Sequence, residues 1–143
     1  EPIAEKDTYG NSGLGITLDE GLAVYFTYIY LKQDANQALY GNNTKILFDK
    51  EKEIFKKLEP FLYKTEEEGC PIYRHCGRSN MCEPIIKDIP ENIQDELCYF
   101  LGFRINQKYV EKHGKNSWKD LYTIPFKEFY ENSGYKEYIE LKQ

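Results

Sequence analysis

Histidine is scarce in this chain, because only His75 and His113 occur among its 143 residues. Neither histidine has the other at helical spacing, so no helix presents the pair of imidazoles that a histidine-based zinc site needs. Methionine and tryptophan occur only once each. A catalytic metal site that depends on two histidines of one helix is therefore excluded for this chain.

Long apolar runs and an excess of positive charge are also missing. The longest strongly apolar stretch, Leu22 to Leu31, contains three tyrosines and a threonine and is too short to span a bilayer. Lys and Arg number 19 against 24 Asp and Glu, and the formal net charge is −5. These features predict no membrane span and argue against nucleic acid as a partner.

Apolar and aromatic residues are abundant. The chain is 41% hydrophobic and 15% aromatic, with thirteen tyrosines and eight phenylalanines. This length and composition are typical of one domain with a packed aromatic core. We therefore expect residues 1–143 to form a single domain.

The first predicted helix covers residues 18–33, because apolar residues recur at helical spacing from Leu18 to Ile29. Thr17-Leu18-Asp19-Glu20 has the spacing of a capping box, in which Glu20 would satisfy free amides at the helix start. The glycine-rich residues 1–15 before it are expected to be an irregular lead-in.

Further helices are predicted downstream. Apolar spacing after Asp49 predicts an amphipathic helix that Pro60 bends or shortens. Asn92 is expected to cap a long helix that ends at Gly114. Shorter helices are predicted from Ser117 to Tyr122, from Pro125 toward Asn132 and around Tyr138, with Ser133-Gly134 between the last two.

Residues 65–91 are predicted to form a long loop, which contains three of the four cysteines. Because no strand alternation is evident, the predicted fold class is mainly α, an irregular helical bundle with a long Cys-containing loop.

The loop cysteines Cys70, Cys76 and Cys82 lie close to His75 in the sequence. Five residues separate each neighbouring pair of cysteines, whereas common zinc knuckles have gaps of about two to four. A disulfide and free buried thiols explain these cysteines equally well, and both explain them better than a metal site does.

Thr17-Leu18-Asp19-Glu20-Gly21-Leu22-Ala23 resembles the glutamate helix of gluzincin zinc metallopeptidases. In that family the glutamate is the third zinc ligand, so the resemblance implies that Glu20 is a metal ligand. The small residues Gly21 and Ala23 would let a neighbouring helix and the metal come close.

A second stretch strengthens the resemblance. Tyr99-Phe100-Leu101-Gly102-Phe103-Arg104-Ile105 and the later Asn132-Ser133-Gly134-Tyr135 resemble the C-terminal half of a bacterial family of predicted zinc-dependent proteases. Residues 17–31 and 97–135 carry the match, whereas residues 33–92 are not diagnostic.

Three more residues are candidates for the substrate site or the surroundings of the metal. Tyrosine donors commonly stabilise the developing oxyanion in this class of enzyme, so Tyr99 and Tyr109 are candidates for that role. Arg104 is a candidate for binding a substrate carboxylate, although an ion-paired or solvated arginine is the commoner case on such a helix. No residue of this chain is assigned a catalytic role.

The His-Glu-x-x-His helix of the family, which supplies two zinc ligands and the general base, does not occur in this sequence. Because that helix precedes the glutamate helix, the resemblance implies that the chain is the C-terminal part of a larger peptidase domain and is inactive alone. Zn²⁺ is expected only when an upstream segment of the same protein completes the site, and the expected substrate is a peptide or protein.

Loss of the upstream helix is also expected to expose apolar surface along Leu22, Tyr25 and Phe26, which would favour self-association. Two other interpretations stay open. The chain can be a noncatalytic protein-binding module on a peptidase-like helical scaffold, with a tyrosine-rich binding surface. Alternatively, Glu20 is only a helix cap in an unrelated α-helical domain.

Overall fold

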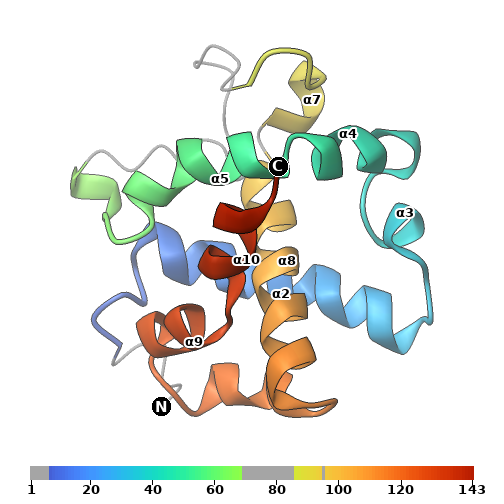
Figure 1. Cartoon of the computed structure of the whole chain (residues 1–143). Coiled ribbons are helices and arrows are strands. Elements are labelled where there is room, and N and C mark those ends of the chain that lie inside the picture. The colour runs from blue at the N-terminus through green and yellow to red at the C-terminus, as the bar shows by residue number, and fades with distance from the viewer. Residues whose placement is uncertain (1–6, 69–85, 95) are drawn as a thin grey trace.

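The computed structural model describes residues 7–68, 86–94 and 96–143, which form a mainly α-helical bundle without strands among them (Figure 1). The predicted fold class is confirmed. No helix of these residues has the length and apolarity needed to cross a membrane. The described helices are α2 (Gly13–Tyr30), α3 (Ala35–Ala38), α4 (Thr44–Asp49), α5 (Glu51–Leu58), α7 (Glu91–Gln94), α8 (Leu97–His113), α9 (Phe126–Asn132) and α10 (Tyr135–Leu141), with 3₁₀ turns η1 (Gly41–Asn43), η2 (Glu59–Phe61), η3 (Glu66–Glu68) and η4 (Ser117–Tyr122).

The two long helices, α2 and α8, cross near the centre of the molecule (Figure 1). At the crossing, Gly21 of α2 meets Gly102 of α8. A Cβ atom on Gly21 would overlap the backbone of Gly102, and one on Gly102 would overlap the carbonyl oxygen of Thr17. The two glycines therefore allow the helix backbones to touch.

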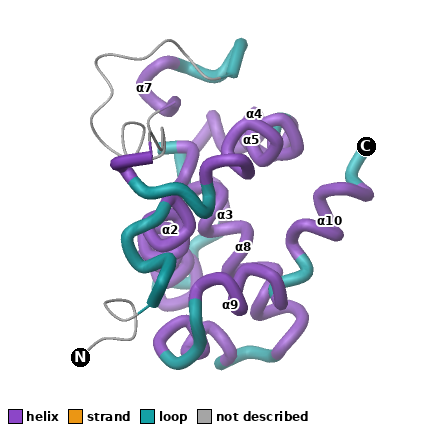
Figure 2. The backbone as a smooth tube through the Cα atoms, turned by 90° about the vertical axis from the view of Figure 1, so that its left-hand side faces the viewer, coloured by secondary structure: helices purple, strands orange, loops and turns teal. Residues whose placement is uncertain are grey.

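Helix α8 is the centre of the bundle, because it contacts α2, α5, α9, α10 and η4. Figure 2 shows α10 on the side of the molecule away from α2. Contacts on several sides bury most of α8, and its side chains Phe100, Leu101 and Phe103 are fully buried.

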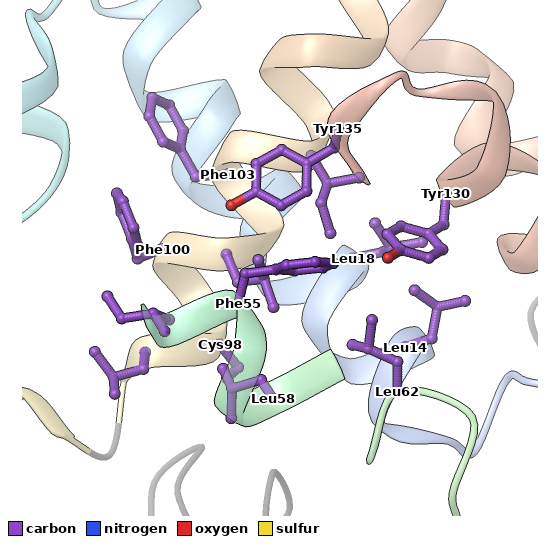
Figure 3. Packing of buried hydrophobic residues seen from close by; sticks show 14 of the residues in the cluster. Leu14, Leu18, Phe55, Leu58, Leu62, Cys98, Phe100, Phe103, Tyr130 and Tyr135 are labelled. Carbon is purple, nitrogen blue, oxygen red and sulfur yellow. The ribbon is translucent and has the colours of Figure 1, made fainter. Parts of the chain in front are cut away.

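The core contains aromatic residues from elements far apart in the sequence (Figure 3). Tyr135 at the start of α10 is fully buried and packs edge-to-face on Phe55 of α5, with 5.4 Å between ring centroids. Phe48 of α4 meets Phe100 of α8 in the same geometry, also at 5.4 Å. Aromatic pairs of this kind contribute roughly 0.5–1.5 kcal/mol beyond the burial of their surface.

The start of α2 differs from the prediction. The helix begins at Gly13, because the Ser12 hydroxyl caps it by accepting a hydrogen bond from the amide of Gly15. Thr17 is therefore inside the helix, and the predicted capping box at Thr17 is wrong. The predicted irregular lead-in is also wrong for residues 13–15.

The start of the long downstream helix differs as well. Asn92 lies within the short helix α7, and the long helix α8 begins only at Leu97. The predicted end at Gly114 is confirmed, because Gly114 caps α8 with a φ of 110°, which glycine adopts without strain.

Other boundaries follow the sequence signals. Helix α5 stops at Leu58, and Pro60 lies in the 3₁₀ turn that follows it. The segment Ser117–Tyr122 is a 3₁₀ helix, and Gly134, with a φ of 73°, separates α9 from α10. Helices α3 and α4 were not predicted.

The predicted Cys-containing loop lies mostly outside the described residues, and so do Cys70, Cys76, Cys82 and His75. The fourth cysteine, Cys98, is buried in α8 and disulfide-bonded.

Candidate functional site

Glu20 lies two turns into α2, well after the first-turn amides that a capping side chain reaches. The interpretation of Glu20 as a helix cap is therefore wrong, because Ser12 fills that role. The Glu20 side chain is half-buried. Capping therefore does not explain why a glutamate occurs at this position of α2.

The face of α2 that carries Glu20 is incompletely covered by the described residues. Side chains three or four positions apart share one face of a helix. Thr17, three positions before Glu20, is buried. The other neighbours of Glu20 on this face are four residues, of which Ala23 is exposed and the rest are half-buried: Ile16, Ala23, Val24 and Thr27. We call these four residues and Glu20 the Glu20 face. The Glu20 carboxylate thus lies among apolar and threonine side chains in the middle of the helix.

The opposite face of α2 is turned to the core. Leu22 and Tyr25 are only 4% and 5% exposed. Phe26 is half-buried and packs edge-to-face on Trp118, with 4.6 Å between ring centroids. The expectation of an exposed apolar surface along Leu22, Tyr25 and Phe26 is therefore wrong.

Tyr99, in the first turn of α8, interacts with Glu20. Burial, the negative charge of Glu20 and a hydrogen bond to the Glu20 carboxylate raise the pKa of the Tyr99 hydroxyl. The phenol therefore stays neutral at physiological pH and keeps its proton for donation to Glu20.

Two residues that the sequence did not single out extend this cluster. Burial and a hydrogen bond to Glu96 raise the pKa of the Tyr40 hydroxyl, and Tyr99 adds to the shift. Glu96 precedes Tyr99 by three positions, so helical spacing was a signal that they lie together. Tyr40 had no such signal, because it reaches the cluster from the connection between α3 and η1.

Asp19 adds a further carboxylate beside Glu20. Burial and the charge of Glu20 raise the pKa of the Asp19 carboxyl. Neighbouring carboxylates disfavour one another's ionised forms, and a bound cation relieves that repulsion. Acidic side chains and tyrosine hydroxyls thus gather at the end of the α2–α8 crossing that holds Glu20.

A complete metal site is not formed by the described residues, which contain no group of three His, Cys, Asp or Glu side chains placed to hold an ion. His113 lies at the far end of α8, about 21 Å along the helix from Tyr99. One of its ring nitrogens, Nε2, lies 2.8 Å from the carbonyl oxygen of Asn132. The described residues therefore do not by themselves complete a metal site around Glu20.

Arg104 lies in the interior of the bundle and is directed away from the Glu20 face. Its Nε donates to the buried Glu51 carboxylate over 2.7 Å, and its Nη2 donates to the Tyr138 hydroxyl over 3.1 Å. Burial lowers the pKa of Arg104, but the Glu51 charge and hydrogen bond outweigh it and raise the pKa overall. Arg104 is therefore ion-paired inside the protein, which was the commoner of its two alternatives.

Tyr109 is also engaged inside the protein. Its hydroxyl donates to Asp120 over 2.7 Å, and its ring stacks on Phe129 with 3.9 Å between centroids. Burial and the Asp120 hydrogen bond raise the pKa of Tyr109. Of the candidate site residues, Gly21 and Tyr99 thus lie beside Glu20, whereas Arg104 and Tyr109 contact other groups.

Comparisons of the chain with family models, with curated proteins and with solved structures find no match. Its function is therefore inferred from the residues and their geometry.

Proposed function

We propose that this chain is the C-terminal helical portion of a gluzincin-like zinc metallopeptidase, which hydrolyses peptide bonds and uses Glu20 as its third zinc ligand. The observation that carries the proposal is the position of Glu20. Its carboxylate lies in the middle of a helix, has no capping role and shares an incompletely covered face with Ile16, Ala23 and Val24.

The contact between α2 and α8 supports the proposal. The first stretch that resembles zinc peptidases lies almost entirely in α2, and the second begins with α8; the two helices meet at Gly21 and Gly102. Tyr99 in the second stretch bonds Glu20 in the first. Hydrogen bonds of this kind hold metal-binding carboxylates in place and tune their affinity, often by about 10- to 100-fold.

The Glu20 face also offers a place for the helix that would carry the two missing zinc ligands. Its apolar side chains offer contact surface to one further helix, and a helix from an upstream segment of the same protein would bring two histidines toward Glu20. We infer that the described residues alone hold no zinc, and that peptidase activity requires the upstream segment.

Zinc analysis of the longer natural protein tests this proposal. We expect one zinc ion per protein by elemental mass spectrometry, and Glu20→Gln is expected to weaken zinc binding at least tenfold because it removes a charged ligand. Glu111→Gln is the matched control, since it makes the same change at an exposed ion pair about 18 Å along α8 from Tyr99. This control should retain its zinc.

Equal zinc content in Glu20→Gln and the natural protein would overturn the proposed ligand role. A natural protein without an upstream His-Glu-x-x-His segment would also overturn the proposal. That result would favour the noncatalytic protein-binding module.

A further inference from the structure

A second feature of the molecule is a hollow between the C-terminal half of α2, the end of α8 and η4. Its volume is about 310 Å³, and its lining includes Tyr25, Ile29, Tyr30, Val110 and Trp118. We call it the Trp118 hollow. This volume is at the lower end of the range for ligand pockets, which suits one large side chain and its backbone.

The walls of the hollow are held in place by ring contacts. Trp118 packs edge-to-face on Phe26 at 4.6 Å and lies 6.4 Å from Tyr122, both between ring centroids. Tyr25 is 5% exposed and packs 6.3 Å from Phe103. An apolar ligand therefore meets a preformed aromatic surface, which lowers the entropy cost of binding.

Two cations flank this aromatic surface. Lys115 and Lys119 belong to the lining of the hollow, and neither ammonium forms an ion pair with a carboxylate of the described residues. Lys119 lies over the Trp118 ring, 5.7 Å from its centroid. In a chain of net charge −5, two lysines at one hollow that have no carboxylate partner in the described part of the chain favour an anionic ligand.

Two acidic side chains of the elements that form the hollow, Glu111 of α8 and Asp120 of η4, already have partners. Glu111, whose charge contributes to a raised pKa of Tyr25, pairs with Lys108 over 2.9 Å. Asp120 accepts the hydrogen bond of Tyr109 over 2.7 Å. They therefore do not neutralise Lys115 or Lys119 by direct pairing.

We propose that the Trp118 hollow binds the C-terminal residue of a peptide, with an apolar side chain against the aromatic wall and the terminal carboxylate between Lys115 and Lys119. A terminal residue carries its side chain and its carboxylate on one Cα atom. It therefore presents both groups within the small space that the hollow offers.

This site is separate from the Glu20 face. Tyr99, beside Glu20, and Val110, in the hollow, are about 16 Å apart along α8. Glu20 and Tyr30 are about 15 Å apart along α2. Peptide binding in the hollow therefore goes beyond the proposed zinc chemistry and does not depend on it.

The test uses the fluorescence of Trp118, which is the only tryptophan in the chain. An N-acetylated dipeptide ending in leucine is titrated into the protein, first with a free carboxylate and then as the C-terminal amide. We expect a saturable change in emission with the carboxylate and at least about tenfold weaker binding of the amide, which corresponds to about 1.4 kcal/mol.

Variants identify the groups responsible. The double variant Lys115→Gln/Lys119→Gln should bind the carboxylate peptide about tenfold more weakly and leave binding of the amide unchanged. The matched control, Lys45→Gln/Lys136→Gln, removes two lysines whose ion pairs lie elsewhere on the surface and should bind like the parent protein. Far-UV circular dichroism checks that each variant is folded.

Three results would overturn the proposal. They are an emission that does not respond to the carboxylate peptide, equal affinities for carboxylate and amide, and unchanged affinity in the folded Lys115→Gln/Lys119→Gln variant. Because the titration needs no zinc and leaves Glu20 unaltered, its outcome is independent of the zinc experiment.

Discussion

The most deeply buried charge among the described residues is the Glu51 carboxylate, which is 0% exposed. It accepts hydrogen bonds from Arg104 over 2.7 Å, from the Tyr135 hydroxyl over 3.2 Å and from Lys142 over 2.8 Å. These donors compensate for the loss of water around the charge. They also connect α5 to α8 and to the C-terminal part of the chain.

Removing one partner of this carboxylate should be costly. Arg104→Met leaves Glu51 buried without its main counter-charge, so we expect the free energy of unfolding to fall by about 3–5 kcal/mol. Urea denaturation measures the change. The control is Lys136→Met, because the 2.6 Å ion pair of Lys136 with Glu59 is largely exposed and such pairs contribute about 1 kcal/mol or less. Equal losses in the two variants would contradict a special role for the buried pair.

At the scale of elements, the contact between α2 and α8 depends on the absence of two Cβ atoms. The backbones meet at Gly21 and Gly102, and no flexible side chain lies between them that could move aside. Small residues here therefore matter more than helix propensity, which favours alanine over glycine by about 1 kcal/mol.

Gly21→Ala should destabilise the protein despite that propensity. The added methyl group overlaps the Gly102 backbone, so the helices must separate, and we expect a loss of about 3 kcal/mol or more in the free energy of unfolding. Ala23→Ser, which adds one atom at an exposed position of the same helix, should change it by less than about 1 kcal/mol. Thermal or urea unfolding measures both. A Gly21→Ala protein as stable as its parent would show that the helices do not touch there.

At the scale of the whole molecule, tyrosine hydroxyls are a common feature of the interior and its margins. Burial is the main cause of a raised pKa in Tyr40, Tyr99, Tyr130 and Tyr135. At Tyr63, burial together with the charge of Glu131 raises the pKa to about 12. The folded state thus keeps these five phenols neutral at pH values at which an unfolded chain ionises them.

This difference predicts alkaline destabilisation. Unfolded tyrosines lose their protons near pH 10, whereas these five keep theirs to higher pH in the folded state, so the unfolded state binds fewer protons there. The stabilisation is therefore fully present below about pH 10 and declines as the pH rises through the raised folded pKa values. The urea midpoint should fall between about pH 9 and about pH 11. A midpoint that stays constant or rises over this interval would contradict the prediction.

The sequence by itself determined the helical class and several boundaries of this protein, because these depend on residues close together in the chain. Pro60, Gly114 and Gly134 act through their own backbone geometry, so their positions predicted where helices end. At the start of α2, two local signals competed. Ser12 and Thr17 both suit a cap, and the choice of Ser12 is supported by contacts to residues near 62–65, which no local pattern contains.

Only the tertiary structure decided which side chains meet. Arg104 finds Glu51 from 53 positions away, and Tyr99 reaches Glu20 because α2 and α8 cross at two glycines. The physical reason is that a helix repeats its side-chain pattern every few residues, so the sequence fixes which face is apolar but not which partner covers it. That choice depends on how all the helices pack together, and it left Arg104 in the interior and Glu20 on an incompletely covered face.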